Sequence, residues 1–88
     1  MNKYKAKALA EYELSLAESL KEKLGDFSLL AKALGQLKGL PETDWQKKSI
    51  SQYTCLLKAC EQDIRYYSDI LHLNYKALIK GVYSVLDM

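Results

Sequence analysis

The chain has 88 residues, of which 49% are hydrophobic and 27% charged, and its formal net charge is +2. This length allows one domain but not two, and a domain so small buries only about 60–65% of the surface that its unfolded chain exposes. The balanced composition excludes a disordered or fibrous protein. Because no apolar run reaches about 18 residues and no signal-peptide pattern is present, we expect a cytoplasmic protein that does not span a membrane.

The scarcity of turn-forming residues predicts an all-α fold. Four Gly and one Pro leave material for a few short connections between long elements. Apolar residues recur at steps of three and four along most of the chain, which is the spacing of amphipathic helices. We therefore predict a single helical domain over residues 1–88: a small antiparallel bundle of three to four helices with one long central helix.

Two helices are predicted in the first half of the chain. The first covers about residues 3–24, and Gly25 is expected to end it as a C-terminal capping glycine. The second covers about residues 27–38 and ends before Gly39. The apolar positions that define the pair are Leu9, Leu16, Leu20, Leu24, Phe27, Leu30, Leu34 and Leu37.

The second half carries one long run of helical pattern. Thr43 and Gln46 have the spacing of a capping box, which predicts a helix start at Asp44. Asn74 is the polar exception within the run, and it is a weak residue inside a helix but a good N-cap. We therefore expect helices over about residues 44–72 and 75–86. The alternative is one continuous helix that projects beyond the others or dimerises.

The apolar arc of this second half is about 200° wide, so we expect the helix to be covered from two sides. The chain also has seven Tyr against one Phe and one Trp, and tyrosine is enriched at the centres of protein interfaces. Together these features predict a surface that binds another protein. The candidate residues are Tyr12, Trp45, Tyr53, Tyr66, Ile70, Leu73, Tyr75 and Tyr83.

A second hypothesis concerns Arg65 and His72, the only arginine and the only histidine. Their spacing of nearly two turns places both on one face of the predicted helix. It resembles the Arg-x(4–6)-His signature of HEPN-domain ribonucleases, which implies that the two residues face RNA; Tyr66 stands where that family usually has a polar residue. The competing interpretation is a solvated charge ladder formed with Glu61 and Asp69.

Two carboxylates, Glu13 and Asp63, fall among apolar neighbours in the pattern. A buried carboxylate has to be paired or hydrogen-bonded, so we expect either a ligand or partner contact, or pairing with a tyrosine, a lysine or water. Cys55 and Cys60 are five apart on a predicted helix, too far for a disulfide, so we expect free thiols. No catalytic motif, metal site or cofactor site is predicted.

The sequence therefore favours a non-enzymatic helical protein that binds another protein, or itself as a homodimer, through an apolar and tyrosine-rich surface. A regulator, inhibitor, adaptor or chaperone would have these properties. The alternative is a protein directed at nucleic acid, including a HEPN-like ribonuclease that uses Arg65 and His72. The scattered lysines and the single arginine give that alternative less support, because phosphate binding needs a concentrated basic face.

Overall fold

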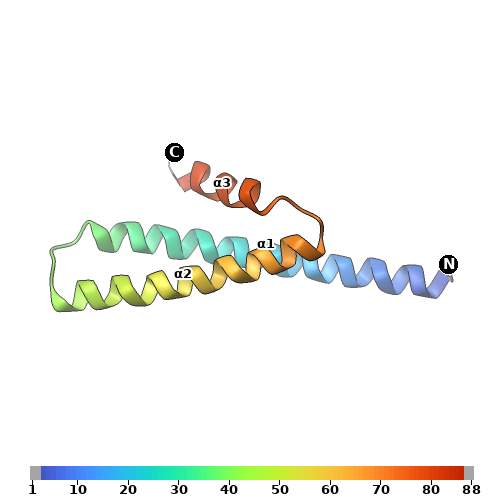
Figure 1. Ribbon diagram of the computed structural model, residues 1–88, viewed down its shortest axis with the longest axis horizontal. Helices are drawn as coiled ribbons and strands as arrows, with labels where there is room; N and C mark the ends of the chain where they lie inside the picture. Colours follow the sequence, from blue (N-terminus) through green and yellow to red (C-terminus); the bar gives the residue numbers. More distant parts are fainter. Residues whose placement is uncertain (1–2, 87–88) are drawn as a thin grey trace.

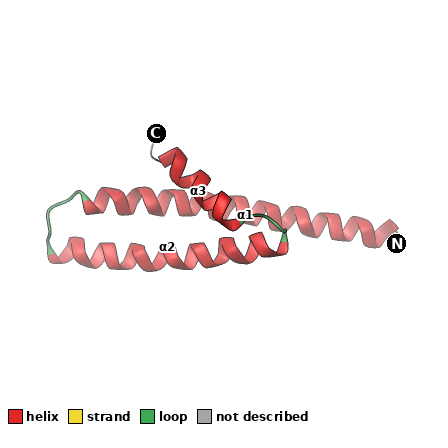
Figure 2. Cartoon of the chain, turned by 45° about the horizontal axis from the view of Figure 1, so that its top comes forward, coloured by secondary structure: helices red, strands yellow, loops and turns green. Residues whose placement is uncertain are grey.

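The computed structural model describes residues 3–86, which form three α-helices and no strand. Helix α1 (Lys3–Lys38) and helix α2 (Asp44–Ile70) pack side by side and antiparallel, and helix α3 (Tyr75–Leu86) lies across one face of that pair (Figures 1 and 2). The all-α antiparallel bundle is confirmed. Its radius of gyration is 16.9 Å, whereas a compact domain of this length would have about 12 Å. The molecule is therefore elongated.

Helix α1 is continuous, and the predicted break at Gly25 is wrong. The segments 3–24 and 27–38 form one helix of 36 residues. Leu20 and Phe27 lie two turns apart on the same face and are both buried against α2, so the apolar stripe continues through Gly25 without a change of phase. Burying large side chains on both sides of the glycine outweighs its cost of about 1 kcal/mol in a helix.

A Gly25→Ala substitution should therefore stabilise the protein by up to about 1 kcal/mol. No glycine among residues 3–86 has a positive φ, and a Cβ at position 25 would meet nothing within 4 Å. Urea denaturation followed by circular dichroism measures the change. A loss of stability would instead indicate that Gly25 caps a helix end.

The connection between α1 and α2 confirms half of the predicted capping box. The Gln46 backbone N–H donates to Thr43 Oγ1 at 3.1 Å. The Gln46 side chain does not return to Thr43; its Nε2 donates to the Leu37 carbonyl at 3.1 Å. That carbonyl is one of the last in α1, and it also accepts from the Leu40 N–H at 3.1 Å. The buried amide therefore ties the start of α2 to the end of α1.

Helix α2 ends at Ile70, two residues earlier than predicted, and the alternative of one continuous helix is wrong. His72 has φ of 58°, and the Leu73 N–H donates to the Ser68 carbonyl at 2.8 Å. This is the hydrogen bond of a Schellman C-cap with a left-handed residue. Asn74 Oδ1 then accepts from the Ala77 N–H at 3.2 Å, so Asn74 is the predicted N-cap of α3. The longest helix is consequently α1 rather than the second-half helix.

The core lies between α1 and α2 under α3. Phe27 and Ile64 are fully buried at its centre. Around them, α3 contributes the half-buried side chains of Tyr75, Leu78, Ile79 and Val82. None of the helices within residues 3–86 combines the length and apolarity that crossing a membrane requires.

Candidate functional site

Two grooves lie between α1 and α2. The first has a volume of about 380 Å³ and the second about 420 Å³. We call the residues that line them the open face. The first groove is lined by Lys23, Asp26, Leu29, Leu30, Leu56, Ala59, Cys60 and Asp63, and the second by Ala33, Gln36, Leu37, Leu40, Trp45, Ser49 and Tyr53.

Both grooves belong to the same side of the helix pair. On α1, their lining residues recur at steps of three and four, the spacing of one helical face: Lys23, Asp26, Leu30, Ala33 and Leu37, and Leu40 follows in the connection to α2. On α2, Trp45, Ser49, Leu56 and Asp63 share one face in the same way. The grooves therefore form one line along the pair, from Lys23 at one end to Leu40 at the other.

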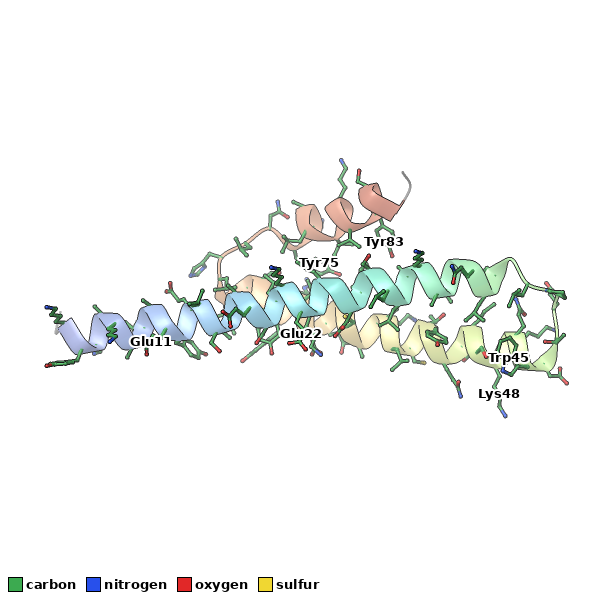
Figure 3. All side chains as sticks on the ribbon, turned by 180° about the vertical axis from the view of Figure 1, so that it is seen from behind. Glu11, Glu22, Trp45, Lys48, Tyr75 and Tyr83 are labelled. Carbon is green, nitrogen blue, oxygen red and sulfur yellow. The ribbon has the colours of Figure 1, made fainter. Side chains whose placement is uncertain are left out.

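Helix α3 covers the opposite side of the pair. Its Tyr83 ring meets the edge of the Phe27 ring of α1, with centroids 5.6 Å apart, and the Arg65 guanidinium of α2 lies 5.9 Å from the centre of the Tyr75 ring. In Figure 3, Tyr75 and Tyr83 point from α3 toward the pair. On a helical wheel, Leu56 and Arg65 are about 180° apart. The open face is thus the side that α3 does not reach.

Large apolar side chains are exposed along the open face. Leu29 is 69% exposed, Trp45 is 64% and Leu56 is 54%, and Leu40 is also exposed. Leu29 and Leu56 line one groove, and Leu40 and Trp45 line the other; single exposed apolar residues are ordinary, but several of them gathered at grooves are typical of an interaction site. The small side chains of Ala33 and Ala59 also line the grooves and leave room for side chains of a partner.

An ion pair marks one end of the open face. Lys23 Nζ lies 3.3 Å from Asp63 Oδ2, which links α1 to α2, and this hydrogen bond raises the pKa of Lys23. Asp63 thus has the lysine partner that the sequence analysis considered. Asp63 is nevertheless 52% exposed, and Glu13 is exposed near the N-terminal end of α1, so neither carboxylate is the buried group that the sequence pattern indicated. Within residues 3–86, no three His, Cys, Asp or Glu side chains come together as metal ligands would.

The structure separates Arg65 from His72. Arg65 remains on α2 and stacks on Tyr75, whereas His72 lies beyond the helix end in a left-handed conformation. The shared helical face on which the ribonuclease resemblance depends is therefore not formed. Glu61, Arg65 and Asp69 keep their four-residue spacing on α2, but within residues 3–86 Arg65 makes no ion pair shorter than 4.0 Å.

The predicted partner-binding residues do not form one surface. Trp45 and Tyr53 line the open face, whereas Tyr75 and Tyr83 lie on the inner side of α3 and cover the core. The others lie elsewhere: Tyr66 is exposed beside Tyr67 on α2, Ile70 is half-buried at the end of α2, Leu73 is exposed in the connection, and Tyr12 is exposed near the start of α1.

Sequence reasoning missed Leu29 and Leu40 as surface residues. Leu29 directly precedes Leu30, which packs against the core, so consecutive leucines widen the apolar arc of α1 beyond what α2 can cover. The two consecutive leucines are the feature of the sequence from which the exposure of Leu29 could have been predicted. Leu56 did appear in the wide apolar arc of the second half, and the structure shows that this width belongs to the open face and to the side under α3.

The two cysteines differ in accessibility. Cys55 is exposed, whereas Cys60 is buried and its thiol donates to the Lys23 carbonyl at 3.2 Å. Burial, with a smaller contribution from the Asp26 carboxylate, raises the pKa of the Cys60 thiol. Above about pH 9 the unfolded chain then loses this proton while the folded chain keeps it, so folding stability decreases as the pH rises.

We expect the free energy of unfolding to fall as the pH rises above about 9, and to fall less steeply in a Cys60→Ala variant. Urea denaturation at several pH values measures how steeply the free energy of unfolding falls with pH in the unsubstituted protein and in Cys60→Ala. Iodoacetamide should modify Cys55 rapidly in the native protein and Cys60 only after unfolding. Equal slopes for the two chains would contradict the burial of this thiol.

Comparison of the chain with protein-family models, with curated proteins and with solved structures found no match. The function therefore has to be inferred from the arrangement of its own residues. Among the features described, the open face unites a defined groove, exposed large apolar side chains and an ion pair at one end. It is the site on which a functional proposal rests.

Proposed function

We propose that this chain is a non-enzymatic helical protein that binds an amphipathic helix of another protein along its open face. The observation that supports the proposal is the row of exposed Leu29, Trp45 and Leu56 beside the groove of α1 and α2. Burying such side chains against a partner is favourable by about 25 cal/mol for each Å² of apolar surface. A regulator, inhibitor, adaptor or chaperone would act in this way.

A helix fits the dimensions of the open face. The lining residues of α1 extend from Lys23 to Leu37, which is about 21 Å of helix and matches a partner segment of about 14 residues. Amphipathic helices bind such grooves through apolar residues at positions i, i+3, i+4 and i+7. The partner helix would complete a four-helix arrangement, with α3 on one side of the pair and the partner on the other.

The chemistry of the groove differs between its ends. Trp45 and Tyr53 line the same groove, with Trp45 at the end near the connection of α1 and α2 (Figure 3), and aromatic side chains of this kind contribute most to many interfaces. Lys23, Asp26 and Asp63 lie at the other end. We therefore expect the partner helix to carry a bulky apolar residue at one end and a charged or polar residue at the other, which fixes its direction.

Photo-cross-linking in the native cell tests the proposal. A benzoylphenylalanine replaces Leu56 on the open face, and a matched variant carries it at Lys58, which is exposed on the same helix about 200° away. Mass spectrometry of the products should show cross-links from position 56 to an amphipathic helical segment of one protein, and none to that segment from position 58. Equal cross-linking from both positions, or none from position 56, would overturn the proposal.

A further inference from the structure

The N-terminal part of α1 continues past the end of α2. Residues 3–15, which we call the overhang, form this projecting part, and all of them are exposed (Figure 1). Leu9, Tyr12 and Leu16 follow at steps of three and four and lead into Leu20, which is buried against α2. The face that α1 presents to α2 therefore continues along the overhang, where Leu9 and Tyr12 are exposed.

The end of the chain carries a stripe that matches this face. Leu57, Ile64, Leu71 and Leu78 recur every seven residues across the connection between α2 and α3. If residues 71–74 were helical, Tyr75 and Leu78 would lie on the face that α2 presents to α1. In the structure the same two side chains of α3 pack against the core. One face of α3 thus suits both arrangements.

The register of the helix pair would bring the two stripes together. Lys23 of α1 faces Asp63 of α2, and Leu37 faces Gln46. Because both helices rise by about 1.5 Å per residue in opposite directions, each residue added after Asp63 faces one residue earlier on α1. A continued α2 would therefore place Leu71 beside residues 12–15 and residue 81 beside the first turn of the overhang. Residues 71–86 are long enough to cover the whole overhang.

No helix-breaking residue imposes the turn between α2 and α3. Residues 71–74 are Leu, His, Leu and Asn, without Gly or Pro. His72, at φ of 58°, lies in the left-handed region, which is unfavourable for a residue with a Cβ atom and which glycine usually occupies at a helix end. Asn74, in contrast, favours the break because it caps α3. The local backbone preferences oppose each other, so the packing of α3 decides between them.

The contacts that hold α3 over the pair are made by rings and apolar side chains. Tyr75 lies against Arg65 at one end of α3, and Tyr83 meets Phe27 near the other. Among the side chains that the structure describes, none makes a hydrogen bond or ion pair between α3 and the pair. Moving α3 would therefore exchange one set of apolar contacts for another and would leave no buried polar group without a partner.

We infer that α3 has two docking positions on its own chain. The first is the folded-back position of Figure 2, in which the helix breaks at His72. In the second, the extended position, α3 continues α2 and packs along the overhang, whose stripe replaces Phe27 and Ile64 as its partner. The two positions exclude each other because they use the same face of α3. The extended position uncovers the side of the pair opposite the open face, so α3 controls access to that side.

Double electron–electron resonance distinguishes the two positions. Nitroxide labels are attached to Lys3→Cys and Lys80→Cys, both exposed, in a Cys55→Ser background in which Cys60 is buried. The folded-back position holds residue 80 close to Phe27, about 30 Å along α1 from residue 3. The extended position brings the two labelled backbones within about 15 Å of each other. The long distance should dominate in the chain with its natural hinge.

Two hinge variants should shift the two distances in opposite directions. His72→Ala with Asn74→Ala removes the cap and favours a continuous helix, so the short distance should gain at least about tenfold over the long one. His72→Gly is the matched control: it relieves the left-handed residue and should lower the share of the short distance. Circular dichroism should show no loss of helix in either variant. Absence of the short distance from the alanine variant, or loss of helix there, would overturn the inference.

A second pair of variants tests whether the overhang is the partner of α3. In the alanine hinge variant, Leu9→Glu should reduce the short distance several-fold, whereas Leu14→Glu, on the opposite side of the overhang, should not. Equal effects of the two substitutions would overturn the inference. The short distance should also persist when the labelled chain is diluted into excess unlabelled chain. Its disappearance would show that α3 is exchanged between two copies, and would likewise overturn docking within one chain.

Discussion

Replacing Phe27 by alanine is expected to lower the free energy of unfolding by about 3–5 kcal/mol. The ring is fully buried between α1 and α2, and it also makes the edge contact with Tyr83 that helps to hold α3 in place. A domain of this length has a total stability of about 4–13 kcal/mol. The variant should therefore be largely unfolded at the lower end of that range.

Leu29→Ala is the matched control for Phe27→Ala, because it removes a large apolar side chain two residues away on an exposed position. It should change stability by less than about 0.5 kcal/mol. Urea denaturation followed by circular dichroism measures both variants. Equal losses of stability in Phe27→Ala and Leu29→Ala would contradict the burial of Phe27, and the exposure of Leu29, in the contact of α1 with α2.

The largest effect on binding is expected from Leu29→Glu combined with Leu56→Glu. Each substitution would place a carboxylate against the apolar side of the partner helix, and a charge buried without a partner is strongly unfavourable. We expect the affinity for the partner helix identified by cross-linking to fall at least about 100-fold. Because both positions are exposed in the free chain, the midpoint of urea denaturation should stay nearly unchanged.

Calorimetric titration of the partner peptide measures this change in affinity. Lys58→Glu together with Leu14→Glu is a suitable control, since both residues are exposed and neither lines a groove. The control should bind the peptide with nearly the affinity of the unsubstituted chain. Undiminished binding by the open-face variant would place the docking surface elsewhere.

The sequence correctly predicts where a helix begins when a side chain accepts a hydrogen bond from a backbone N–H of the first turn. Thr43 and Asn74 both accept the hydrogen bonds that their cap positions require, and such local chemistry is visible in a single sequence. Gly25 was misjudged because a glycine at a helix end and a glycine inside a helix look alike in sequence. The burial of Leu20 and Phe27 on one face decided between them, and burial depends on α2.

The candidate site was predictable in composition but not in position. The excess of apolar and tyrosine residues indicated surfaces beyond a single core, yet Tyr75 packs against that core whereas Leu29 is exposed. Which side of the pair α3 covers depends on the turn at His72, whose left-handed conformation redirects the chain. The spacing of apolar residues along a single helix does not indicate which side of the pair α3 covers. The same turn separates His72 from Arg65.

The most direct test of the proposed function uses Trp45, the only tryptophan, as a reporter on the open face. In the free protein its indole is exposed, so its fluorescence should be quenched efficiently by acrylamide. When the cross-linked partner helix is added as a peptide, the emission should shift to shorter wavelength and quenching should fall several-fold, because the peptide covers the groove beside Trp45. A complex that forms with unchanged emission and unchanged quenching of Trp45 would contradict docking along the open face.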